Sequence, residues 1–291
     1  MTTVTWPTRD HTEHSDTRPA TSRLRRQAVE HVISTARERL EEPLSLPELA
    51  GMAWLSPYHF NRVFRQVTGM SPFHFLSAMR METAKRMLLT TSLSVTDICF
   101  TVGYQSLGSF TTHFTRFVGL PPTRLRCLSQ EYLHDTIESL CDRPAPTSHA
   151  PAHQGLSGQI AMQDSFSGPI FVGLFPTPIP QQRPSVCCLL TGPGAYHIPR
   201  VADGTYFVFA AAFEWSSDPL AYLLPDQGSV RVGVARSPVT VVNSRVEGTV
   251  DVVLRPPRLI DPPILIALPL LLAERADTVE HQTSIRSGLA L

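Results

Sequence analysis

An internal repeat of about fifty residues constrains the fold of this 291-residue chain more than any other feature. Leu44–Ala50 aligns with Leu93–Cys99, and after one inserted residue the two copies stay in step. The pairs matched in this second stretch are Phe60 with Phe110, Phe64 with Phe114, Gly69 with Gly119, and Pro72 with Pro122. Because a sequence that repeats at such a period builds one supersecondary unit more than once, we expect two similar units.

Each copy carries the signals of a helix, a turn and a second helix. Ser45 and Ser94 each precede an acidic residue by three positions, as in a capping box. In the first copy Ser56–Pro57 starts the second helix, since serine is a good N-cap and proline is tolerated at the first helical position. Apolar residues then recur every three or four positions, and Gly69 and Gly119 end these helices. Each copy is therefore predicted to form a helix-turn-helix.

A connecting helix is predicted from Ser71–Pro72 to about Leu89. Its roughly 18 residues would span about 27 Å at 1.5 Å per residue. Successive major-groove faces of DNA lie about 34 Å apart. A rod of this length predicts that two reading helices are held over neighbouring grooves on one face of DNA.

The repeat and its flanks match a longer ordered pattern between Leu24 and Cys127, about a third of the chain. The residues that carry it lie in Leu44–Ala50, Leu55–Arg65, Thr68–Pro72, Arg80–Leu89, Val95–Tyr104 and Ser109–Pro122. This segment resembles the DNA-binding domain of the AraC/XylS family of bacterial transcription regulators. The resemblance implies double-stranded DNA as the partner and sequence-specific regulation of transcription as the function.

The first reading helix is expected to expose Tyr58, Asn61, Arg62 and Arg65 between its core positions. The resemblance places Tyr58, Asn61 and Arg62 where family members touch base edges. Arginine can pair with guanine and asparagine with adenine, and each such pair discriminates by about 1–3 kcal/mol. Arg65 is expected to contact phosphate.

The second reading helix departs from this polar set. Leu107 and Gly108 cannot hydrogen-bond a base through their side chains. We expect Ser109, Thr112 and Arg116 to reach sugar-phosphate or a single base. The hypothesis is that sequence specificity is concentrated in the half-site under the first motif.

The charge distribution supports this division of labour. The chain has no net charge, but residues 23–127 hold 13 Lys and Arg against 7 Asp and Glu. A basic helical domain and an acidic remainder indicate that only the former meets a polyanion. Arg80, between two methionines in the connecting helix, is expected to be a structural ion-pair partner rather than a DNA contact.

The fold class expected is an all-α double helix-turn-helix domain followed by an all-β sandwich domain. The predicted divisions are a disordered tail (1–22), the helical domain (23–140), a linker (141–165), the β-sandwich (166–260) and a C-terminal tail (261–291). The predicted strands are Ile170–Phe175, Val186–Leu190, Thr205–Phe213, Val230–Val234, Val239–Val242 and Val250–Leu254. They are short, β-branched or aromatic, and separated by turn residues.

The β domain carries a weaker resemblance, in Gly168–Gly173 and Tyr196–Val208, to the carboxypeptidase-regulatory or transthyretin-like sandwich. Such sandwiches are binding or interaction modules. The resemblance implies ligand sensing or dimerisation, and the partner is left open among a small-molecule effector, RNA polymerase and a second copy of the chain. The alternative for the whole protein is a ligand- or protein-binding interaction module with a helical scaffold.

Other classes of protein are disfavoured by the sequence. Its longest apolar run, Ile264–Leu272, is far shorter than the roughly 18 residues of a membrane helix. Residues 1–26 are polar, so we do not expect them to act as a secretory signal. Five cysteines without a Cys-x-x-Cys pair favour a reduced, cytoplasmic protein. His149 and His153 lie among prolines, so no metal or other cofactor is expected there. No phosphate loop or nucleophile elbow is present, and we expect no enzymatic activity.

Overall fold

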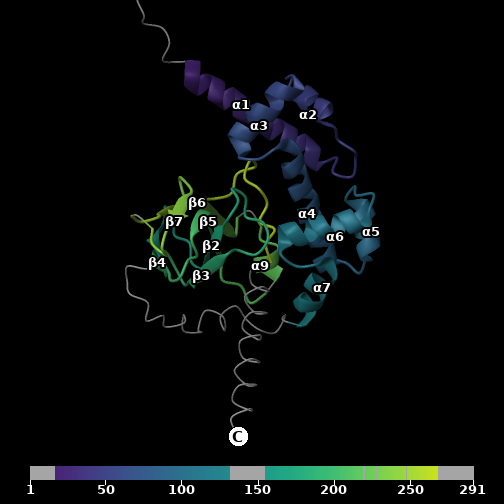
Figure 1. The fold of residues 1–291 in the computed structure, drawn as a ribbon. Coiled ribbons are helices and arrows are strands. Elements are labelled where there is room, and N and C mark those ends of the chain that lie inside the picture. The colour runs from purple at the N-terminus through teal and green to yellow at the C-terminus, as the bar shows by residue number, and fades with distance from the viewer. Residues whose placement is uncertain (1–16, 132–154, 219, 227, 247, 268–291) are drawn as a thin grey trace, which may run out of the picture.

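The computed structural model describes residues 17–131 and 155–267, except 219, 227 and 247. The described residues form a helical domain followed by a β domain, which confirms the expected fold class (Figure 1). His149 and His153 lie outside the described residues. Within the described part of the chain, no helix is both long and apolar enough to span a membrane.

Seven helices build the described helical domain. They are α1 (Thr17–Arg37), α2 (Leu46–Met52), α3 (Pro57–Thr68), α4 (Pro72–Thr90), α5 (Val95–Thr101), α6 (Leu107–Val118) and α7 (Pro122–Glu131). Helix α1 begins at Thr17, so the expectation of a tail through residue 22 is wrong for its last six residues. The apolar stripe of α1, which includes Val29, Val32 and Ile33, is buried against the first helix-turn-helix.

The two predicted copies are α2–α3 and α5–α6, and their caps are the predicted ones. Ser45 and Ser94 form complete capping boxes with Glu48 and Asp97. Gly69 and Gly119 end α3 and α6 in the left-handed region, with φ of 80° and 91°, where a side chain would be strained.

Helix α4 connects the two units and packs against both α3 and α6 (Figure 1). Its residues Phe75, Leu76 and Met79 belong to the core of the first unit. Its residues Met81, Ala84 and Leu88 belong to the core of the second. This split explains why a 19-residue helix is apolar on several sides, since it has a core to fill at each end.

The β domain places two sheets face to face. Strands β1 (Leu156–Met162), β4 (Gly194–Ile198) and β8 (Val252–Leu254) form one, in the order β4-β1-β8. Strands β2 (Ile170–Phe175), β3 (Val186–Leu190), β5 (Gly204–Phe213) and β6 (Val230–Val234) form the other in the order β3-β2-β5-β6, and β7 (Val239–Val241) pairs with β5. The buried residues of both sheets make one core between them.

The predicted divisions of this half need two corrections. Strand β1 lies inside the predicted linker, and β4 and the short helix α9 (Leu220–Leu223) were not expected. The predicted tail is also wrong for residues 261–267. Leu265, Ile266 and Ala267 are buried in the core of the second helix-turn-helix, and the Ala267 amide donates to the Val118 carbonyl at 3.1 Å. An apolar run without charges is stabilised by such burial.

Candidate DNA-binding interface

The exposed face of α3 is built by alternation with its core. Phe60, Val63 and Phe64 are buried. The predicted reading residues share the opposite face: Tyr58 is 83% exposed, Arg62 and Arg65 are exposed, and Asn61 is half-buried. Among the described residues, neither Arg62 nor Arg65 pairs with a carboxylate, so both guanidinium groups are available to an external anion or base edge.

The position of α3 is fixed by its ends. The Ser56 hydroxyl accepts from the His59 amide, and Pro57 occupies the first turn. Trp54, in the turn before it, has a left-handed backbone with φ of 56° and is 94% exposed. The aligned position of the second copy is Gly103, with φ of 82°. Sequence reasoning missed Trp54, although the repeat alignment places it opposite a glycine.

Helix α6 exposes Ser109, Thr112 and Arg116 on one face. The Thr112 hydroxyl donates to the Gly108 carbonyl at 2.9 Å, so its proton is already used within the helix. His113 Nδ1 lies 3.0 Å from the Tyr104 hydroxyl. Fewer free donors therefore face outward from α6 than from α3.

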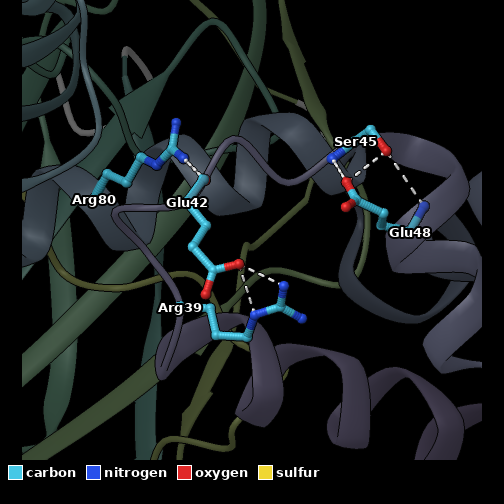
Figure 2. Close-up of polar contacts among 5 residues, drawn as sticks. All are labelled: Arg39, Glu42, Ser45, Glu48 and Arg80. Carbon is cyan, nitrogen blue, oxygen red and sulfur yellow. Dashed lines mark hydrogen bonds and ion pairs between the residues drawn. The ribbon is translucent and has the colours of Figure 1, made fainter.

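Arg80 ties the connecting helix α4 to the loop that precedes the first motif, but not as an ion pair. Its Nε donates to the Leu40 carbonyl at 2.7 Å. Its Nη2 donates to the Glu42 carbonyl at 2.6 Å (Figure 2). The ion-pair prediction is wrong because backbone carbonyls, rather than a carboxylate, accept these bonds. Burial lowers the pKa of Arg80, yet arginine stays charged at any physiological pH.

The loop that accepts these bonds also meets the turn of the second motif. A Cβ added at Gly103 would lie 2.9 Å from the carbonyl oxygens of both Leu40 and Glu41. The loop is stiffened locally, since Arg39 Nε donates to the Glu42 carboxylate at 2.9 Å (Figure 2). The Arg39 hydrogen bond lowers the pKa of Glu42, and the Ser45 hydroxyl lowers that of Glu48 in the adjacent cap. Residues 40–42 therefore connect the start of the first motif to the turn of the second.

Two capped helix-turn-helix units around one shared helix define a double helix-turn-helix domain. The sequence model of a family described as "Helix-turn-helix domain" matches residues 49–127.

Curated relatives match over the same part of the chain. An uncharacterized HTH-type transcriptional regulator, YobQ of Bacillus subtilis, is 34% identical over 94 residues, which are 32% of this chain and 39% of that protein. The bifunctional transcriptional activator/DNA repair enzyme AdaA of Bacillus subtilis is 33% identical over 89 residues, 31% of this chain and 42% of its own. The chain thus spans about two fifths of the length of these relatives.

Among solved structures, the DNA-binding domain of AdpA in complex with a target DNA is 31% identical to this chain. The match covers 36% of this chain and 94% of that one, with a TM-score of 0.35. The predicted roles of individual reading residues stay predictions, as does the sandwich resemblance of the β domain.

Proposed function

We propose that the protein is a sequence-specific DNA-binding transcription regulator that reads two adjacent major-groove segments with α3 and α6. The observation that carries this proposal is the exposed polar face of α3 in a duplicated and capped helix-turn-helix, where neither arginine pairs with a carboxylate of the described residues. Two exposed arginines on one face of a short helix, with no carboxylate partner among the described residues, are available to a polyanion. The domain that bears them is also the basic part of the chain.

The two helices have unequal roles in this proposal. Asn61 and Arg62 read bases, Tyr58 packs against a thymine methyl group, and Arg65 neutralises a phosphate. Ser109, Thr112 and Arg116 mainly fix the second motif on the sugar-phosphate backbone and contact at most a single base. The Thr112 bond to the Gly108 carbonyl supports a positioning role, because a hydroxyl that donates within its own helix discriminates little between bases.

The β domain modulates the DNA-binding domain in this account. The Gln182 amide donates to the carbonyl of Arg116 in α6 at 2.6 Å, and the Ala267 amide donates to Val118 at its end. A change in the β domain would therefore reach the second reading helix directly. Its partner is a small-molecule effector, RNA polymerase or a second copy, and the protein acts in the cytoplasm without enzymatic activity of its own.

The Arg62→Ala variant tests the assignment of α3. We expect loss of preference for an operator selected from random DNA, with weak general DNA affinity remaining, because base contacts specify and phosphate contacts position. Fluorescence anisotropy with operator and scrambled DNA at fixed salt measures both. Arg236→Ala, which removes an exposed arginine of the β domain, is the matched control and should retain the preference.

Two outcomes would reject the proposal. If Arg62→Ala discriminates operator from scrambled DNA as well as the wild type does, α3 is not the reading helix. If the wild type shows no sequence preference at all, the interaction module with a helical scaffold is the better account.

A further inference from the structure

A cavity of about 300 Å³ lies where α4 and α1 meet the β domain. Lys85 and Arg37 line it from the helices, and Phe175 and Phe209 line it from β2 and β5. Residues 261–266, which cross from the β domain to the second helix-turn-helix, complete the wall. Figure 1 shows the β domain beside α4. The volume is at the lower end of the range of small-molecule sites.

Lys85 is the only lysine of the chain, and it is 1% exposed. Its Nζ has three donors but, among the described residues, reaches a single acceptor, the Ile264 carbonyl, at 3.5 Å. That distance is beyond the usual range of a nitrogen–oxygen hydrogen bond. Within the described residues, no carboxylate lies at ion-pair distance from Nζ. Glu82, one turn away, is held by Arg37 at 3.3 Å.

A buried amine with one long hydrogen bond and no carboxylate at ion-pair distance among the described residues is costly, since little compensates its desolvation. The burial lowers the pKa of Lys85 to about 7. A structural residue at this site would be better served by leucine or methionine. The Lys85 amine is therefore placed where a bound ligand could supply the hydrogen-bond acceptors that the described residues do not.

The remaining charges around the cavity favour an anion as that group. Arg255 is satisfied by a two-pronged bond to Asp261, at 2.7 and 2.9 Å. Arg86 and Arg258 are exposed at the cavity and make no ion pair with any described carboxylate. The lining thus has a surplus of positive charge above an apolar, aromatic floor. The Phe175 and Phe209 rings of that floor are packed edge to face with centroids 5.6 Å apart.

We propose that this cavity binds a small apolar carboxylic acid, with its carboxylate accepting hydrogen bonds from Lys85 and its apolar part lying on Phe175 and Phe209. The acid bridges the β domain and α4, the helix shared by both DNA-reading units. Binding of the acid depends only on the cavity and its lining residues, and not on whether the protein binds DNA. Its effect on DNA binding rests on the proposed function.

The test uses the full-length protein and straight-chain and phenyl-substituted monocarboxylic acids of six to twelve carbons, each paired with its alcohol. Isothermal titration calorimetry should show at least one acid binding tenfold or more tightly than its alcohol. Lys85→Met should reduce that preference to less than twofold, and Arg236→Met should leave it unchanged. Circular dichroism of Lys85→Met checks that the fold is retained.

A second readout follows from Lys85 being the only lysine. Protein labelled with carbon-13 at lysine Cε gives one side-chain signal, and the acid, but not the alcohol, should move it. If no acid binds at millimolar concentration, or if Lys85→Met binds acids as the wild type does, the site is refuted.

The DNA-binding measurement separates this proposal from the proposed function. A bound acid should change operator affinity at least threefold. Acid binding in a protein without any DNA preference would support the site and reject the proposed function. Operator binding that no acid changes would reject the regulatory half of the inference.

Discussion

Replacing Arg80 with methionine should destabilise the protein by about 3 kcal/mol. The variant keeps most of the apolar stem but removes two hydrogen bonds, of 2.7 and 2.6 Å, to the carbonyls of Leu40 and Glu42. Hydrogen bonds from a charged donor contribute about 1.5–3 kcal/mol each. Arg80 is half-buried, so we take the lower value for both.

Urea unfolding followed by circular dichroism measures this change. The matched control is Arg65→Met, which removes an exposed arginine of the same domain and should change the unfolding free energy by less than about 0.5 kcal/mol. Arg80→Lys should fall between the two, because lysine keeps the charge but cannot reach two carbonyls with a fixed fork. A loss below about 1 kcal/mol in Arg80→Met would refute the idea that this side chain ties α4 to the loop before α2.

Three further substitutions test other parts of the account by the same assay. Gly103→Ala should lower the free energy of unfolding by at least about 2 kcal/mol, because its Cβ would meet two backbone oxygens at a positive φ. Its control is Gly51→Ala, whose Cβ would contact no other atom and which should stabilise α2 by up to about 1 kcal/mol. Trp54→Gly should stabilise the protein by up to about 1 kcal/mol, since it relieves a left-handed backbone and loses little burial; a destabilised variant would contradict this. Because the pKa of Lys85 is about 7 when folded and well above this when unfolded, the unfolded state binds more protons between pH 7 and 10. The free energy of unfolding of the wild type should therefore rise over that window by up to about 1.4 kcal/mol per pH unit, relative to that of Lys85→Met. If the unfolding free energies of the two proteins change in parallel with pH, the lowered pKa of Lys85 is refuted.

Local chemistry explains which elements the sequence predicts well. The caps at Ser45, Ser56 and Ser94, and the terminating Gly69 and Gly119, act within four residues of themselves and were all confirmed. The strands rich in β-branched and aromatic residues were also confirmed, because the preference of these residues for strands can be recognised within a short stretch of sequence. Strand β4 was missed because Gly194–Ile198 contains a glycine, an alanine and a histidine, and is held by pairing with β1.

Contacts between residues distant in sequence could not be predicted from local sequence patterns. The acceptors of Arg80 lie about forty residues before it, and no local pattern marks a backbone carbonyl as a partner. The burial of Lys85 depends on docking of the β domain onto α4, which the repeat does not specify. The predicted reading residues are local to α3 and α6, and the structure places each at the surface or half-buried, but their roles await measurement.

The central claim is that two helix-turn-helix units, held by α4, occupy neighbouring windows of one DNA duplex and that α3 supplies most of the specificity. The direct measurement is a hydroxyl-radical footprint on an operator selected from random DNA, followed by substitution of every base pair within it. We predict two protected segments about one helical turn apart, with the large affinity penalties confined to one of them. A single protected segment, or equal penalties in both halves, would contradict the account.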